Sequence, residues 1–188
     1  MTDQERLVAL LATRSARRGQ FVLASGRSST LYIDARLTTM SPEGLVLIGS
    51  LGLALLDDRG WDVDSIGGLT LGADPISYAI SYASACSAHP RRAFSVRKEA
   101  KAHGTGKLIE GPFASGDRVA VIEDVITTGS SALRAIDAVQ AAGGTVVGVL
   151  ALVDREEGGR ETIEARGVPV APLVRAHDIV ARLGPVSP

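Results

Sequence analysis

The chain has 188 residues, enough for one domain with a sizeable hydrophobic core but not for a second full domain. Hydrophobic residues make up 45% of it and charged residues 22%, a balance typical of globular proteins. The 20 Lys and Arg residues are matched by 21 Asp and Glu residues, so the overall charge gives no reason to expect nucleic acid or a membrane as a partner.

The single cysteine limits the chemistry further. Cys86 has no second cysteine to pair with, so neither an intrachain disulfide nor a cysteine-based zinc site can form, and we expect a small apolar residue on a helix. No stretch is long and apolar enough to cross a bilayer, and Asp3 and Glu5 stand where a signal peptide would carry basic residues. The sequence therefore predicts a cytoplasmic protein.

Residues 1–40 predict a helix followed by a hairpin. Thr2 and Glu5 have the spacing of a capping box, and apolar residues at helical spacing follow them as far as Leu11. Two short strand-forming runs come next, at 21–23 and 31–34. We expect this unit to form a small hood over a binding site.

A helix, a strand and a glycine-rich loop are predicted for residues 41–75. Ser41-Pro42 marks a helix start, and 63–66 is a short strand. The glycine-rich segment 67–75 leads into a helix that starts at Pro75. Such a loop can bind an anion through its backbone N–H groups, but a simple strand-to-helix turn explains it equally well.

Residues 97–111 concentrate positive charge after a predicted strand at 93–96. The segment contains glycines and few apolar residues, and its basic side chains are Arg97, Lys98, Lys101, His103 and Lys107. Because it has little to bury, we expect a mobile catalytic loop, able to close over a polyanion and exclude water. A solvated charged loop is the alternative for such a charge run taken alone.

The most informative stretch is 119–131. Its apolar, β-branched start predicts a buried strand that stops at the adjacent acids Glu123 and Asp124. A turn of hydroxyl residues and glycine follows, then a helical pattern over 132–139. Free N–H groups and hydroxyls at a helix N-terminus suit a phosphate, and the acids suit hydroxyl groups or a metal. The alternative is a strand capped by a polar turn, with Ser130 as the helix N-cap.

The order of elements predicts an α/β fold with a central, mainly parallel sheet and helices on both faces. Another apolar strand, 145–153, ends at Asp154-Arg155, and 161–183 adds a helix, an edge strand and a last helix without assigned chemistry. Ligands bind at the carboxyl ends of such strands, where Gly68, Arg97, the acid pair and Arg155 should converge. Arg155 can grip a carboxylate, or it forms a surface ion pair with Glu156 or Glu157.

These motifs carry a family resemblance. The run 119–131 resembles the phosphoribosyl-pyrophosphate (PRPP) signature of type I phosphoribosyltransferases, and Arg97-Lys98-Glu99-Ala100-Lys101-Ala102-His103-Gly104-Thr105-Gly106 resembles the catalytic loop of orotate phosphoribosyltransferases. The likeness extends in order from Phe21 to Arg155. It departs at Ala24, where the family commonly has a lysine, and in the loop 68–75, which lacks the lysine of many relatives.

The resemblance implies the type I phosphoribosyltransferase fold and Mg²⁺-dependent transfer of ribose 5-phosphate from PRPP to orotate, giving orotidine 5′-monophosphate and pyrophosphate in pyrimidine (UMP) biosynthesis. It assigns catalysis to Lys101, His103 and Asp124, and orotate binding to Tyr32, Ile33, Thr127 and Arg155. It assigns PRPP binding to Thr70, Leu71, Gly72, Arg97, Lys98, Lys101, His103, Glu123, Asp124, Val125, Ile126, Thr127, Thr128, Gly129, Ser130 and Ser131. No side chain is expected to bind the magnesium directly, because substrate oxygens and water would hold it.

The resemblance also implies a homodimer in which the loop 97–111 reaches the partner's active site, with Arg97 acting in trans. Two alternatives stay open: a phosphoribosyltransferase for a purine or uracil, and a PRPP sensor that regulates transcription or another enzyme. A sensor usually loses the catalytic loop or gains a DNA-binding domain. This chain keeps the loop and has neither spare length nor a surplus of basic residues.

Overall fold

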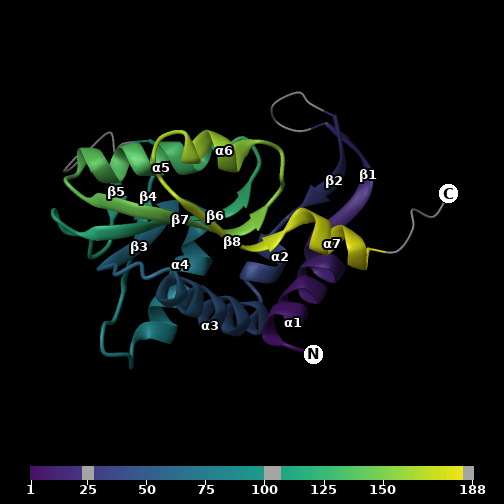
Figure 1. The fold of residues 1–188 in the computed structure, drawn as a ribbon, viewed down its shortest axis with the longest axis horizontal. Helices are drawn as coiled ribbons and strands as arrows, with labels where there is room; N and C mark the ends of the chain where they lie inside the picture. The colour runs from purple at the N-terminus through teal and green to yellow at the C-terminus, as the bar shows by residue number, and fades with distance from the viewer. Residues whose placement is uncertain (23–27, 100–106, 184–188) are drawn as a thin grey trace.

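A six-stranded sheet with the order β5-β4-β3-β6-β7-β8 runs through the centre of the molecule (Figure 1). The computed structural model describes residues 1–22, 28–99 and 107–183. In these ranges β4, β3, β6, β7 and β8 are parallel, and the two-residue β5 runs antiparallel at one edge. The strands are β3 (Ser65–Leu69), β4 (Arg92–Val96), β5 (Ile109–Glu110), β6 (Arg118–Ile126), β7 (Thr145–Asp154) and β8 (Val170–Arg175). The predicted mainly parallel sheet is confirmed.

Helices cover both faces of the sheet, as predicted. Figure 1 shows α5 (Ser130–Ala141) and α6 (Gly159–Glu164) on one face, and α3 (Pro42–Asp58) and α4 (Ala73–Ser84) on the other. The helix α1 (Asp3–Leu10) packs on α3 and continues into the short π-helix η1 (Leu11–Ser15). None of the helices in the described ranges combines the length and apolarity needed to cross a bilayer.

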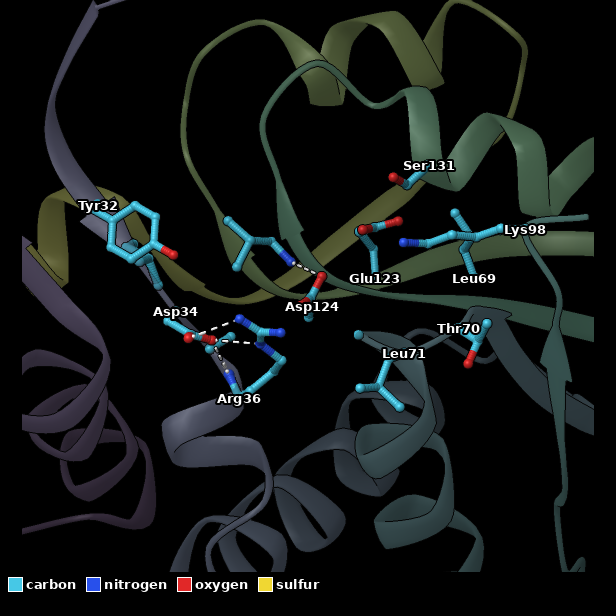
Figure 2. A pocket seen from close by; sticks show the side chains of 14 residues that line it. Tyr32, Asp34, Arg36, Leu69, Thr70, Leu71, Lys98, Glu123, Asp124 and Ser131 are labelled. Atoms are coloured by element: carbon cyan, nitrogen blue, oxygen red, sulfur yellow. Dashed lines mark hydrogen bonds and ion pairs between the residues drawn. The ribbon is translucent and has the colours of Figure 1, made fainter. Parts of the chain in front are cut away.

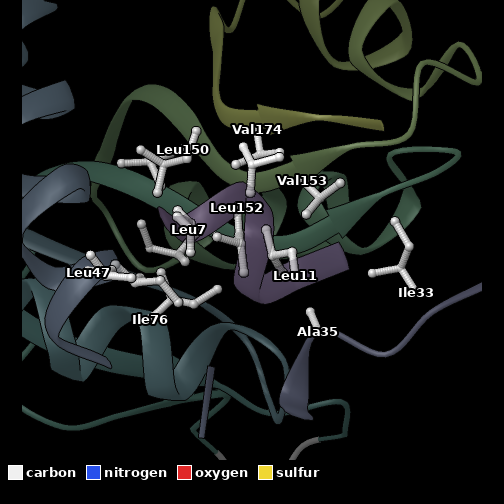
Figure 3. Close-up of a cluster of buried hydrophobic side chains, with 14 of the residues drawn as sticks. Leu7, Leu11, Ile33, Ala35, Leu47, Ile76, Leu150, Leu152, Val153 and Val174 are labelled. Carbon is white, nitrogen blue, oxygen red and sulfur yellow. The ribbon is translucent and has the colours of Figure 1, made fainter. Parts of the chain in front are cut away.

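The two faces explain the continuous apolar runs of the central strands. Along β6, Ala120 and Ile122 join the core beneath α1, α3 and α4, whereas Val119 and Val121 join the core beneath α5. Neighbouring residues of a strand point to opposite faces, so a strand covered on both sides must be apolar throughout. Figure 3 shows the first core, where Leu7 and Leu11 pack against Leu152.

The hairpin at the N-terminus is confirmed, with both strands beginning earlier in the chain than the predicted 21–23 and 31–34. Strand β1 (Ala16–Val22) pairs antiparallel with β2 (Ser28–Ile33), and the short helix α2 (Arg36–Thr39) follows. The Arg18 Nη2 group donates a hydrogen bond to the Val180 carbonyl at 2.9 Å, which ties the hairpin to α7 (Ala176–Arg182). Whether residues 1–40 act as a hood stays a prediction.

Several predicted boundaries were wrong. Strand β3 spans Ser65–Leu69 instead of 63–66, so Gly67 and Gly68 belong to the strand and not to a loop. Strand β6 does not stop at the acid pair but continues to Ile126. Cys86 is exposed and follows α4, which ends at Ser84, so it does not lie on the helix. The segment 97–111 contains β5, and its predicted mobility stays a prediction.

Candidate active site

A cavity of about 310 Å³, here called the central pocket, opens at the carboxyl ends of β3 and β6, between the hairpin and the sheet (Figure 2). Its lining comes from four separate parts of the chain. The lining residues are Tyr32, Ile33, Asp34, Ala35, Arg36, Leu69, Thr70, Leu71, Gly72, Lys98, Glu123, Asp124, Val125 and Ser131. Ten of them belong to the predicted site: Tyr32, Ile33, Thr70, Leu71, Gly72, Lys98, Glu123, Asp124, Val125 and Ser131.

A second hollow, here called the cradle, is lined by Glu123 and by residues 125–131 at the start of α5. Gly129 caps the helix with φ of 81°, a left-handed conformation that favours glycine, and Ser130 is the first helical residue. Ser130 is therefore not the N-cap of the alternative interpretation. The first N–H groups of a helix have no partner within it and attract anions. The cradle shares Glu123, Val125 and Ser131 with the central pocket, so the two hollows adjoin each other.

The acid pair straddles the end of the sheet. Alternation along β6 directs Glu123 to the face of α5 and Asp124 to the face of α4. Accordingly Glu123 lines the cradle, while the Asp124 carboxylate lies against Gly72 at the start of α4. A side chain at Gly72 would put its β-carbon 2.5 Å from Asp124 Oδ2, so any other residue there would require the Asp124 carboxylate to move.

The Glu123 carboxyl is in an unfavourable position for a negative charge. Its residue is 9% exposed. Burial raises the pKa of Glu123 well above its usual value, and the neighbouring Asp124 carboxylate raises that pKa further. Asp124 itself accepts a hydrogen bond from the Val125 N–H at 2.9 Å. The two neighbouring carboxyl groups are therefore costly to ionise together.

The loop before α4 is held by hydrogen bonds of its own. The Thr70 hydroxyl donates to Asp74 Oδ2 at 2.6 Å, and the Thr70 N–H donates to the Val96 carbonyl at 2.8 Å. The peptide bond between Thr70 and Leu71 is cis. Because the loop carries no cationic side chain, and the hydroxyl and N–H of Thr70 already donate to Asp74 and Val96, it can offer an anion only backbone N–H groups beyond Thr70.

Of the first two residues of the basic segment 97–111, one lines the central pocket and the other does not. Lys98 lines the central pocket, and its carbonyl accepts a hydrogen bond from Arg134 Nη2 of α5 at 2.7 Å. Arg97 does not line the pocket; its Nη1 lies 3.6 Å from Glu110 Oε1. Lys101 and His103 lie outside the described residues, so their predicted roles stay predictions.

Arg155 directly follows β7 and is buried, and it lines neither the central pocket nor the cradle. Its Nη2 group donates to Glu157 Oε1 at 2.7 Å, to Ser29 Oγ at 3.0 Å and to the Leu31 carbonyl at 2.9 Å. The alternative ion pair with Glu157 is therefore present, although it is not on the surface: the Arg155 side chain is 5% exposed. Its Nε atom is buried without a hydrogen-bond partner. Thr127, the other predicted orotate ligand on the sheet, lines the cradle.

Two charged pocket residues were missed in the sequence. The guanidinium of Arg36 donates from Nε to Asp34 Oδ1 at 2.8 Å and from Nη2 to Asp34 Oδ2 at 3.0 Å. These hydrogen bonds lower the pKa of the Asp34 carboxyl, against the opposing effect of burial. The signal available was an acid at the last position of the predicted strand 31–34, with an arginine two positions further on.

Comparison with known proteins identifies the family. No family model matches the sequence. The chain is 46% identical over 183 residues to the orotate phosphoribosyltransferase of Aquifex aeolicus, covering 96% of this chain and 99% of that protein. It is 48% identical over 177 residues to that of Mycobacterium tuberculosis, covering 94% and 96%. The chain belongs to the orotate phosphoribosyltransferase family.

Solved structures agree with this assignment. The orotate phosphoribosyltransferase of Mycobacterium tuberculosis H37Rv in complex with PRPP is similar with a TM-score of 0.80 and 41% identity, over 95% of this chain and 99% of that one. The orotate phosphoribosyltransferase of Aeropyrum pernix gives a TM-score of 0.78 and 32% identity, over 94% and 97%. The predicted family and the predicted type I phosphoribosyltransferase fold are confirmed.

Proposed function

We propose that this chain transfers ribose 5-phosphate from PRPP to orotate, releasing pyrophosphate and forming orotidine 5′-monophosphate in UMP biosynthesis. Family membership supports the reaction, and one observation supports its location: the cradle and the larger central pocket adjoin each other at the carboxyl ends of β3 and β6, where the acid pair lies. A phosphorylated ribose needs this combination of donors for its phosphate and acceptors for its hydroxyl groups.

The cradle is the proposed site of the 5-phosphate. Its backbone N–H groups lie at the positive end of the α5 dipole, and Thr127, Thr128, Ser130 and Ser131 add hydroxyl groups. Val125 and Ile126, the last residues of β6, also line the cradle, and Gly129 turns the chain into α5. Binding the phosphate at this distance from the reacting carbon orients that carbon and contributes to catalysis.

The acid pair is the proposed site of the ribose hydroxyls. Glu123 and Asp124 accept hydrogen bonds from the 2′- and 3′-hydroxyl groups. Positive charge grows on the ribose ring as its bond to pyrophosphate breaks, much as in glycoside cleavage. Carboxylates fixed beside the ring stabilise that charge. The raised pKa of Glu123 means that substrate binding must favour its ionised form.

Pyrophosphate is proposed to leave toward Lys98 and the backbone of Thr70, Leu71 and Gly72. Lys101 and His103 add donors as the loop 97–111 closes, and Arg97 acts from the partner subunit of a homodimer. Negative charge that develops on the leaving group is stabilised by these preorganised donors.

Magnesium is the proposed cofactor, held by pyrophosphate oxygens and water. No group of three His, Cys, Asp or Glu side chains in the described ranges could bind a metal by itself. Asp34 is engaged by Arg36, and Glu123 lies on the cradle side of β6, which leaves Asp124 as the carboxylate best suited to a water of the metal. When bound, the ion neutralises charge on the pyrophosphate.

Orotate is proposed to lie between the hairpin and the sheet, against Tyr32 and Ile33, with Thr127 on its far side. Arg155 binds its carboxylate: an arginine fork matches a carboxylate, and the Arg155 Nε is a buried donor in need of an acceptor. The ring nitrogen then attacks the ribose carbon directly. Asp124 or a water accepts a proton. We propose no covalent intermediate, because none of the proposed site residues resembles an activated nucleophile.

One assay tests this function. The purified protein is mixed with magnesium, PRPP and either orotate, uracil, adenine or hypoxanthine, and pyrophosphate release is followed. We expect pyrophosphate release with orotate and with none of the other three bases. Release with another base instead would identify the alternative phosphoribosyltransferase, and binding of PRPP without turnover of any base would identify the sensor. We further propose that the enzyme acts in the cytoplasm.

A further inference from the structure

Arg36 is held in a fixed orientation at the wall of the central pocket. Besides the two side-chain hydrogen bonds from Nε and Nη2, its backbone N–H donates to Asp34 Oδ1 at 3.2 Å. Asp34 and Arg36 therefore form a short rigid unit where β2 passes into α2. A bidentate pair of this kind reduces the number of side-chain conformations that a ligand would have to select.

The same pairing leaves part of the guanidinium for a ligand. Nε and Nη2 form one edge of the fork and face Asp34, so the Nη1 group is not part of the pair. The Arg36 side chain is 52% exposed while it lines the cavity. Figure 2 shows it between Asp34 and Leu71, near Asp124.

The acidic lining of the pocket gives a second cationic side chain a role in binding a polyanion. Three carboxylates line the central pocket, those of Asp34, Glu123 and Asp124, and the cationic side chains among its described lining residues are Lys98 and Arg36. A diphosphate brings several negative charges close to Asp124. Lys98 and Arg36 reach the pocket from different elements, with the loop Thr70–Gly72 between them (Figure 2).

The position of Arg36 also indicates which anionic group of the two substrates it can bind. The cradle proposed for the 5-phosphate is not lined by Arg36. Arg155, proposed for the orotate carboxylate, lies against Ser29 and Leu31, and it does not line the central pocket. Arg36 instead shares its wall with Leu71 and Gly72, which belong to the loop proposed for pyrophosphate.

We propose that Arg36 binds the pyrophosphate group of PRPP from the hairpin side of the pocket, opposite Lys98, and that Asp34 is its positioning residue. This inference rests on the proposed function. It assigns a substrate contact to the segment that follows the hairpin, at the start of α2, so that the pyrophosphate is bound from two walls of the pocket, by Arg36 and by Lys98.

Calorimetric titration with inorganic pyrophosphate in the presence of magnesium tests the contact directly. We expect Arg36→Ala to raise the Kd for pyrophosphate about tenfold, the effect of losing one charge-assisted contact at a half-exposed site. Arg36→Lys should recover part of the affinity. The Kd for ribose 5-phosphate and the Kd for orotate should stay within about twofold of wild type, a range that corresponds to a few tenths of a kcal/mol.

Arg14→Ala is the matched control, because Arg14 is similarly exposed and pairs with Glu43 at 3.1 Å away from the pocket. If Arg36→Ala fails to fold, Arg36→Gln keeps a donor for Asp34, removes the charge and carries the same expectation. Unchanged pyrophosphate affinity would overturn the proposal, and so would parallel loss of all three ligands or loss of orotate alone. An inactive wild type that still binds pyrophosphate through Arg36 would instead refute the proposed function and leave the contact standing.

Discussion

At the scale of single residues, the site depends on charges placed where water cannot fully stabilise them. Glu123 is the clearest example: it is nearly inaccessible, and it lies next to a second carboxylate. Such an arrangement costs folding free energy when both groups are ionised, and a protein keeps it where a ligand needs the charge. The cost is measurable as a pH dependence of stability.

We predict that Glu123→Gln stabilises the protein at neutral and alkaline pH. The folded pKa of Glu123 is raised, so between the unfolded and the folded pKa the native state binds more protons than the unfolded state. Stability then falls as pH rises, by up to about 1.4 kcal/mol per pH unit in that window. Urea unfolding of both proteins from pH 5 to pH 9 measures this. A stability difference that stays constant with pH would contradict a buried, proton-binding Glu123.

Arg155 allows a second test at this scale. Arg155→Ala should weaken orotate binding by about ten- to a hundredfold, the range for a charged hydrogen bond, and should leave PRPP binding largely intact. Because the arginine also joins Ser29, Leu31 and Glu157, thermal unfolding must be recorded alongside the titrations. Equal loss of both ligands would refute a specific role in orotate binding.

At the scale of elements, the end of β6 and the start of α5 form one functional unit. The strand delivers the two acids to opposite faces, and Gly129 turns the chain so that the helix N-terminus closes the cradle. The turn is tightly packed: a β-carbon at Gly129 would lie 2.7 Å from the Gly159 carbonyl oxygen. The geometry of the cradle therefore depends on the absence of a side chain at this position.

We predict that Gly129→Ala reduces the affinity for ribose 5-phosphate, whereas Gly116→Ala does not. Both glycines have positive φ, 81° and 93°, so both variants lose about 1–2 kcal/mol from the backbone conformation. A β-carbon at Gly116 meets nothing within 4 Å, which makes that variant a control for the conformational cost alone. Unfolding curves and titrations with ribose 5-phosphate separate the two effects. Equal affinities would show that the cradle does not bind the phosphate.

The loop 97–111 is the other element with a predicted role in the reaction. Lys101→Ala should lower turnover by about two orders of magnitude, the scale of losing one preorganised donor to the transition state. Lys107→Ala is the control within the same segment, because Lys107 is exposed and does not line the pocket. Steady-state rates with saturating substrates measure both. Near-normal turnover of the Lys101 variant would remove that residue from the mechanism.

At the scale of the whole molecule, the sequence predicted the sheet, its two helical layers and the edge at which the central pocket and the cradle open. It could do so because apolar strands, acid pairs and hydroxyl-rich turns are contiguous along the chain. The contributions of Asp34, Arg36 and the buried side of Arg155 could not be predicted in the same way. They depend on how the hairpin packs over the sheet, which brings Ser29 and Leu31 to a residue far along the chain.

Subunit exchange tests whether the complete site needs two chains. If the loop acts across a dimer, mixing inactive Lys101→Ala with inactive Asp124→Asn creates mixed dimers in which one site combines an intact loop and an intact pocket. Random mixing puts half of the subunit pairs in that state, each with one working site of two, so activity should recover to about a quarter of wild type. If the loop acts within its own subunit, every site in the mixture keeps one defect, and the mixture stays as inactive as its components.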